Sequence, residues 1–218
     1  RVLFLRMKLS DHQGKLMKLG KEGTGAFALC RTPDGGFALA GFGMNGLSSN
    51  ARALLMKVSK TGLEEWSKYY GTTATNVAYG IDSFQGGFIL AGESRTKNIQ
   101  EGEWLIIGTN TEGDTNWTRS FAPSGVGAGY DVTIGNSIYV CGSVRGSAAP
   151  NSSVLVAALT SSGRTVWKKA YGNATDDQFG YAVDAGSDEF PIVAGKSIIG
   201  EDAEAYMLRL NSEGIVAQ

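Results

Sequence analysis

Hydrophobic residues in this chain gather in short runs that recur about every 50 residues. Each run ends in glycine, and the four runs are Phe37–Gly41, Phe88–Gly92, Ile138–Gly142 and Pro191–Gly195. Their closing glycines lie 51, 50 and 53 residues apart. Self-similarity at a period of this length is typical of repeat proteins, in which each repeat is one small supersecondary unit. We therefore interpret the chain as a series of equivalent units.

Polar turns between the runs carry a second marker in the same phase. One glycine recurs with spacings of 51, 50 and 51 residues, at Gly62, Gly113, Gly163 and Gly214. A tryptophan follows the first three of these glycines by four residues, at Trp66, Trp117 and Trp167. The tryptophans fall in the last strand that we predict for each unit, where a large ring would wedge against the neighbouring unit. We interpret both residue types as structural markers of the repeat.

Each unit predicts four short strands separated by turns. In the second unit these strands are Ala78–Asp82, Phe88–Gly92, Trp104–Thr109 and Thr115–Phe121. Clusters of Gly, Asp and Asn between β-branched and aromatic runs are typical of hairpins. No stretch with the period of a helix extends beyond about two turns. We therefore predict an all-β protein.

A repeated unit of this length with four antiparallel strands is typical of a β-propeller blade. We divide a single domain, 1–218, into an extra strand pair and four units, and the five segments are 1–22, 23–71, 72–122, 123–172 and 173–218. Two arrangements stay open. The termini could pair and close a ring of four or five blades, or the chain could form an arc of a larger propeller. We favour closure, because an unpaired apolar strand at Val2–Leu5 would leave an aggregation-prone edge.

The repeat also resembles a known family. The matching residues are Asp34-Gly35-Gly36-Phe37, Ala40-Gly41, Lys57, Gly62, Trp66 and Tyr70-Gly71, and Gly163, Trp167 and Tyr171-Gly172 repeat the end of the pattern. This pattern is similar to the β-propeller repeats that are often found in secreted and surface proteins of bacteria and archaea. The resemblance implies a propeller fold and an extracellular or cell-surface location. It implies no activity, because propellers serve binding, scaffolding and several chemistries.

Composition limits the partners of the chain. Its 218 residues are 42% hydrophobic, which suffices for one sizeable core. The formal net charge is −1 and there is no stripe of Lys and Arg, so we expect no nucleic-acid partner. No apolar run reaches the roughly 18 residues of a membrane-spanning helix, so we expect no membrane insertion. The chain does not begin with Met, and we expect a processed form or a fragment of something longer.

The sequence offers little catalytic chemistry. His12 is the only histidine, which argues against a metal site built from histidines and against a catalytic triad. The Gly-x-x-x-Trp marker is similar to the docking motif of pyrroloquinoline-quinone dehydrogenases, but it lacks the Asp of that motif and the chain has no vicinal cysteines. We therefore expect no catalytic residues, no metal and no cofactor. Cys30 and Cys141 are interpreted as small core residues rather than as a disulfide.

Three groups of residues are candidates for binding or modification. Tyrosines recur at intervals of 51 residues in the first predicted strand, which lines the axis of a propeller, at Tyr79, Tyr130 and Tyr181. Two acidic pairs of the last unit could face the same surface, and these are Asp176, Asp177, Glu201 and Asp202. Three N-x-[ST] sites are candidates for glycosylation, at Asn116, Asn151 and Asn173.

Three functional hypotheses follow from this pattern. Because the loops 42–52, 93–103, 143–153 and 196–204 differ while the strands agree, we favour a non-enzymatic binding or scaffold module for a protein or glycan ligand. The first alternative is a structural subunit that joins further copies of itself into a ring, array or filament by strand addition. The second is a hydrolase or lyase that uses Tyr130 and Tyr181 with Asp131 or Asp184. Such an enzyme would need two carboxylates about 5–10 Å apart.

Overall fold

The computed structural model describes residues 2–8, 13–44, 50–71, 74–95, 102–121 and 125–217. Over these residues the protein is all-β, with four antiparallel sheets of three or four strands preceded by a two-stranded hairpin. The strands of each sheet follow one another in chain order. The prediction of an all-β, propeller-like fold is therefore confirmed.

The strands are bounded as follows. The hairpin contains β1 (Val2–Lys8) and β2 (Gln13–Leu19). The first sheet contains β3 (Gly25–Arg31), β4 (Phe37–Gly43), β5 (Arg52–Val58) and β6 (Glu64–Tyr70). The second contains β7 (Thr75–Phe84), β8 (Gly87–Arg95), β9 (Gly102–Thr109) and β10 (Thr115–Phe121). The third contains β11 (Gly125–Ile134), β12 (Ile138–Gly146), β13 (Ser153–Leu159) and β14 (Thr165–Tyr171). The fourth contains β15 (Asp177–Ala185), β16 (Pro191–Ile199) and β17 (Asp202–Arg209).

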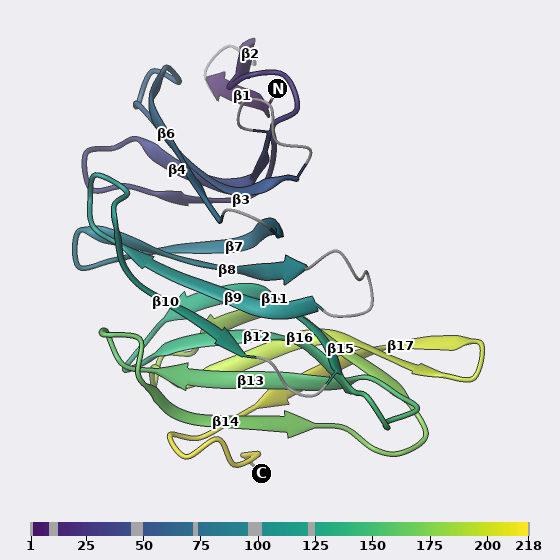
Figure 1. Ribbon diagram of the computed structural model, residues 1–218. Helices are drawn as coiled ribbons and strands as arrows, with labels where there is room; N and C mark the ends of the chain where they lie inside the picture. Colours follow the sequence, from purple (N-terminus) through teal and green to yellow (C-terminus); the bar gives the residue numbers. More distant parts are fainter. Residues whose placement is uncertain are drawn as a thin grey trace.

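The sheets stack face to face in chain order (Figure 1). Successive side chains of a strand point to opposite faces of its sheet, so a central strand supplies two interfaces at once. In β8, Phe88 and Leu90 pack against the first sheet, whereas Ile89 and Ala91 pack against the third. All four are at most 4% exposed, and burying a large apolar side chain is worth roughly 1.5–3 kcal/mol. This double burial explains why the second strand of each repeat is a continuous apolar run.

The termini do not pair with each other within the described residues. β1 pairs only with β2, and β17 pairs only with β16. The N-terminal hairpin and the C-terminus lie at opposite ends of the stack in Figure 1. The prediction that the termini would close a ring is therefore wrong for this part of the chain. The physical reason is that the hairpin has another partner, because Val2 and Leu19 are buried against Leu54 and Met56 of the first sheet.

The tryptophan and glycine markers meet across the sheet interfaces. A Cβ added to Gly163 would lie 2.5 Å from ring atoms of Trp117, and one added to Gly214 would lie 2.8 Å from the ring of Trp167. Each of these glycines also has a positive φ, +75° and +69°, a backbone conformation that residues with a Cβ rarely adopt. Each of these glycines therefore permits the tight turn of its own sheet and also leaves room for the tryptophan ring of the preceding sheet.

We predict that Gly163→Ala destabilises the protein by about 1–3 kcal/mol more than Gly35→Ala does, because only the first change displaces a packed ring. Gly35 is the matched control, since its φ is +80° and a Cβ there would meet nothing within 4 Å. Urea denaturation followed by tryptophan fluorescence measures both losses. Equal losses of stability in the two variants would contradict the contact that we assign to Gly163 and Trp117.

Candidate ligand-binding pocket on the axis

The inner strands of all four sheets carry a β-bulge at the same repeat position. The ladder skips one residue between Ala78 and Gly80 in β7, and it does so at equivalent points of β3, β11 and β15. The skipped residue is aromatic in every sheet, and the four are Phe27, Tyr79, Tyr130 and Tyr181. A bulge leaves its extra residue unpaired and re-aims the side chain. The repeat thus aims one aromatic ring per sheet in the same way.

The bulge also accounts for the glycine that closes each apolar run. Gly92 pairs with Ala78, immediately beside the bulge. A Cβ on Gly92 would lie 1.9 Å from the carbonyl oxygen of Val77, and the equivalent distances at Gly41, Gly142 and Gly195 are 1.9, 2.0 and 1.8 Å. No other residue fits so close to a backbone atom. The Ala-Gly marker of the sequence is therefore a requirement of the bulge.

The four bulge residues form one continuous aromatic row. Ring centroids lie 5.2 Å apart between Phe27 and Tyr79, 5.7 Å between Tyr79 and Tyr130, and 5.4 Å between Tyr130 and Tyr181. These distances and the tilted planes are those that aromatic pairs prefer. The tyrosines that the sequence assigned to the axis lie together in this row, with Phe27 as a fourth member that the sequence analysis did not include.

A second row runs beside the first and varies in chemistry. It consists of the residue that follows each bulge-facing glycine, namely Phe42, Glu93, Ser143 and Lys196. Each contacts the aromatic row in its own way. Phe42 packs on Phe27 at 5.7 Å, and Ser143 Oγ lies 3.4 Å from the Tyr130 hydroxyl. Lys196 Nζ lies 5.8 Å from the centroid of the Tyr181 ring.

Glu93 makes the strongest of these contacts. Its carboxylate accepts a hydrogen bond of 2.6 Å from the Tyr79 hydroxyl and an ion pair of 2.8 Å from Arg95. The Glu93 residue is only 4% exposed. Burial, followed by the hydrogen bond to Glu93, raises the pKa of Tyr79 above its ordinary value. Tyr79 therefore stays neutral and acts as a hydrogen-bond donor, while Glu93 stays fixed between two partners.

A pocket of about 320 Å³ opens beside these rows, and we call it the axial pocket. It lies where β8 and β12 end and where β11 and β15 begin, next to the loops that the sequence analysis assigned to recognition. Its polar and aromatic lining comes from three sheets, and the residues are Glu93, Arg95, Tyr130, Ser143, Arg145, Ser152, Asp177 and Phe179. Two guanidinium groups and two carboxylates thus share one cavity with two aromatic side chains.

Two donors of the pocket lack partners among the described residues. The Nε atom of Arg95 is buried without a hydrogen bond, and Arg145 forms no ion pair there. By contrast, the acceptors are engaged. Glu93 is held as described, and Asp177 Oδ1 accepts the amide of Ser152 at 2.7 Å. Arg145 therefore offers free donors of positive charge in the pocket, together with the aromatic face of its neighbours.

Comparisons with known proteins support the fold and leave the activity open. No family model matches the chain, and no curated protein matches it. A solved protein of unknown function from Bacteroides caccae is similar over 97% of this chain, with a TM-score of 0.58 and 10% identity. The chain covers 66% of the length of that structure, and at this identity the likeness shows the fold alone.

A GH43 endo-arabinanase from Bacillus licheniformis is a more remote match. It is 9% identical to this chain, with 87% of this chain and 95% of the arabinanase covered. The TM-score is 0.31, and a likeness at that level carries no argument about this protein.

The predicted acidic residues do not all reach the pocket. Only Asp177 lines it. Asp176 instead closes its own turn, because its carboxylate accepts hydrogen bonds from Asn173 at 2.6 Å and Thr175 at 2.7 Å, which lower its pKa. Glu201 and Asp202 lie at the exposed β16–β17 turn, outside this pocket. The two acidic pairs therefore do not form one site.

Asp131, one of the two carboxylates of the enzyme hypothesis, has a structural partner, and so does Asp82, which the hypothesis did not include. Asp131 Oδ2 accepts the amide of Val183 at 3.0 Å, and Asp82 Oδ2 accepts the amide of Ile134 at the same distance. Both bonds join the inner strands of neighbouring sheets. Burial raises the pKa of each of these carboxyl groups. Asp184, the other candidate, is exposed.

The three N-x-[ST] sites differ in their surroundings. Asn116 is exposed and lies at the register shift of β10, opposite the end of β9. The Asn151 amide nitrogen donates to the carbonyl of Ala174 at 2.7 Å, and that of Asn173 donates to Asp176 at 2.6 Å. Glycosylation of these sites stays a prediction.

Two other kinds of site are absent from the described residues. They contain no group of three or more His, Cys, Asp or Glu side chains arranged to hold a metal ion. They also contain no helix long and apolar enough to cross a membrane. Cys30 and Cys141 are free thiols, and burial raises the pKa of both.

We predict that Glu93→Ala lowers the free energy of unfolding by about 2 kcal/mol, because it leaves the Tyr79 hydroxyl and Arg95 without their partner. Ser143→Ala at the equivalent repeat position should cost less than about 1 kcal/mol, since it removes one long hydrogen bond. Urea denaturation of the two variants measures the difference. Equal costs would contradict the role assigned to the Glu93 contacts.

Proposed function

We propose that this protein is a non-enzymatic binding module, secreted or displayed on a cell surface, that takes an acidic glycan in the axial pocket. The observation that carries the proposal is the variable row beside the constant aromatic row. Four equivalent positions hold an aromatic ring, a carboxylate, a hydroxyl and an ammonium on the same bulged backbone. A rigid frame with side chains that differ at one position is how recognition surfaces are built.

The chemistry of the pocket favours a ligand with both a flat apolar face and an anionic group. Tyr130 and Phe179 supply aromatic surface, which binds apolar faces. Arg145 supplies a planar fork of donors that matches a carboxylate in two parallel hydrogen bonds. A sugar ring that carries a carboxylate combines these two features. The resemblance of the repeat to secreted bacterial and archaeal propellers gives the proposed location.

The hydrolase alternative has less support from this geometry. An enzyme of that type needs a carboxyl group that can give up or take a proton. Glu93 is bound by Tyr79 and Arg95, Asp177 is bound by an amide, and Asp131 joins two strands. These carboxylates therefore serve the framework of the pocket.

Assembly with further copies is a second candidate, favoured by one observation. β17 is the outer strand of its sheet, and Met207 within it is 76% exposed. Sedimentation velocity over a hundredfold range of concentration tests this candidate. A sedimentation coefficient that rises with concentration would support assembly, whereas a constant monomer value would contradict it.

We predict that Tyr130→Ala and Arg145→Ala each weaken glycan binding at least tenfold, because each removes one of the two recognition elements. Arg164→Ala is the matched control, since this exposed arginine lies in the turn between β13 and β14, away from the pocket, and should leave affinity unchanged. Screening an array of neutral and uronic-acid oligosaccharides, followed by titration calorimetry, measures these effects. Retention of peptides but of no glycan, or glycan binding that survives both variants, would overturn the proposal.

A further inference from the structure

A second cavity, of about 410 Å³, lies between the first and second sheets. It is formed by the turn that joins β3 to β4 and the turn that joins β7 to β8, so it opens at the end of the sheets that carries the tight turns. Its apolar walls include Pro33, Trp66, Phe84 and Phe88. We call this cavity the turn-side groove. It shares no residue with the axial pocket.

Beside the groove, the first sheet carries a lysine where the second and third sheets carry glycine and alanine. In each of the first three sheets a strand residue pairs directly with the marker tryptophan. The pairs are Gly108 with Trp117, Ala158 with Trp167, and Lys57 with Trp66. A Cβ on Gly108 would lie 2.3 Å from the Trp117 ring, so that ring lies flat on its partner. Lys57 is the only one of these three partners with a long, charged side chain.

Trp66 packs on Gly113 as its counterparts pack on Gly163 and Gly214, since a Cβ on Gly113 would lie 2.8 Å from its ring, but its indole nitrogen differs from theirs. The indole nitrogen of Trp117 donates to the carbonyl of Ser161 at 3.0 Å, and that of Trp167 donates to the carbonyl of Ser212 at 2.8 Å. Among the described residues Trp66 forms no such bond. Its ring meets Phe88 edge-on, with centroids 6.3 Å apart. The Trp66 ring forms one wall of the groove.

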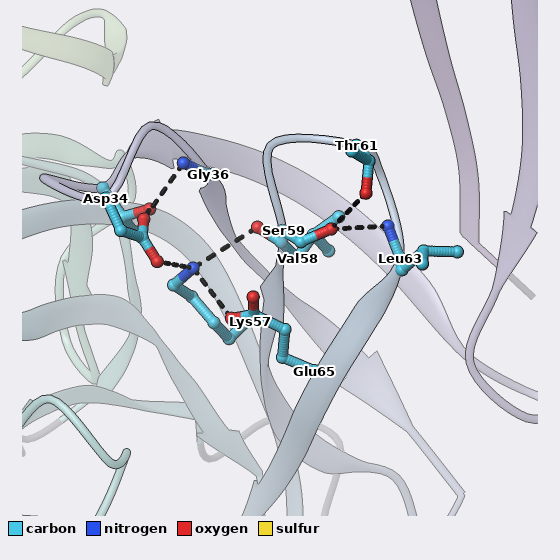
Figure 2. A network of polar contacts seen from close by, with 9 residues as sticks. Asp34, Gly36, Lys57, Val58, Ser59, Thr61, Leu63 and Glu65 are labelled. Atoms are coloured by element: carbon cyan, nitrogen blue, oxygen red, sulfur yellow. Dashed lines mark hydrogen bonds and ion pairs between the residues drawn. The ribbon is translucent and has the colours of Figure 1, made fainter.

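Lys57 is held in an ion network at the edge of the groove (Figure 2). The residue is 7% exposed, and its Nζ lies 2.7 Å from Asp34 Oδ2, 3.0 Å from Glu65 Oε2 and 3.4 Å from the carbonyl of Val58. An ammonium group has three hydrogens to donate. Its donors are therefore all engaged, and Lys57 has none left for a ligand.

The network has no donor left for a ligand, but its carboxylates can still accept hydrogen bonds. Asp34 and Glu65 together carry two negative charges against the one positive charge of Lys57. The hydrogen bond from Lys57, with others from Thr32 and Gly36, holds the pKa of Asp34 well below its usual range. Both carboxylates line the groove beside the face of Trp66. The groove therefore combines a net negative charge with aromatic walls.

We propose that the turn-side groove binds a small organic cation, in which an ammonium group is carried on an aromatic or short alkyl body. The ammonium lies against Glu65 and the Trp66 ring, where a carboxylate and the negative face of an aromatic system both attract it. The apolar body packs between the walls formed by Trp66, Phe84 and Phe88. This site is independent of the glycan proposed for the axial pocket.

The test uses three probes of one shape and different charge: 2-phenylethylammonium, 2-phenylethanol and phenylacetate. Each is titrated into the ¹⁵N-labelled protein, and the indole N–H signals are followed by NMR, with the Trp66 signal assigned from Trp66→Phe. We expect saturable shifts of the Trp66 signal with the cation, at an affinity at least tenfold above that of the other two probes. Equal affinities, or the absence of saturation with the cation, would overturn the proposal.

Two variants separate this site from general attraction of cations. Glu65→Gln should weaken binding of the cation at least fivefold, whereas Glu204→Gln, at an exposed carboxylate of β17, should leave it unchanged. Both carboxylates are exposed, so we expect both variants to stay folded, with changes in the NMR spectrum confined to the changed residue and, for Glu65→Gln, to its partner Lys57 and their neighbours. Equal effects of the two changes would show attraction to charge alone and would overturn the site.

Discussion

The structure depends on the burial of each sheet against its neighbours. A four-stranded sheet of this kind has two apolar faces, and water is excluded from each face only when the next sheet packs against it. In β8 the alternating residues Phe88 and Ile89 belong to different interfaces, so the same strand joins the sheets on both sides. At the outer edge the seat of Trp117 on Gly163 fixes how the sheets align. Removing one such contact therefore weakens two sheets together.

The repeat made the fold predictable, because one periodic feature encodes both the turn and the contact. The glycine of each turn and the tryptophan after it predicted the strand order and the outer-edge contact, which Gly163 and Trp117 form. The position of the N-terminal hairpin was not predictable. The apolar strand at Val2 predicts that this segment is covered by another part of the protein. The sequence does not indicate whether the covering element is the edge of a strand or the face of a sheet. In the structure it is the face of the first sheet.

The candidate sites were predictable only in part. The 51-residue spacing of the tyrosines predicted that they lie together on the inner strands. Nothing in that spacing indicated that Tyr79 is a bulge residue or that its hydroxyl donates a hydrogen bond to Glu93. The signal was available in the residue after each repeated glycine, which changes from sheet to sheet while its neighbours do not. The same comparison at Lys57, where the second and third sheets have glycine and alanine, points to the turn-side groove. In a repeat protein, departures from the repeat are where individual function is encoded.

The most direct test of this account is native-state hydrogen exchange on Trp117→Ala. If the sheets depend on their neighbours, the change should speed exchange of the central amides in β9 and β13, on both sides of the interface that Trp117 spans. Amides in β4 and β5 of the first sheet should keep more of their protection. Faster exchange confined to β10 would contradict the account, because it would mean that each sheet stands without the next.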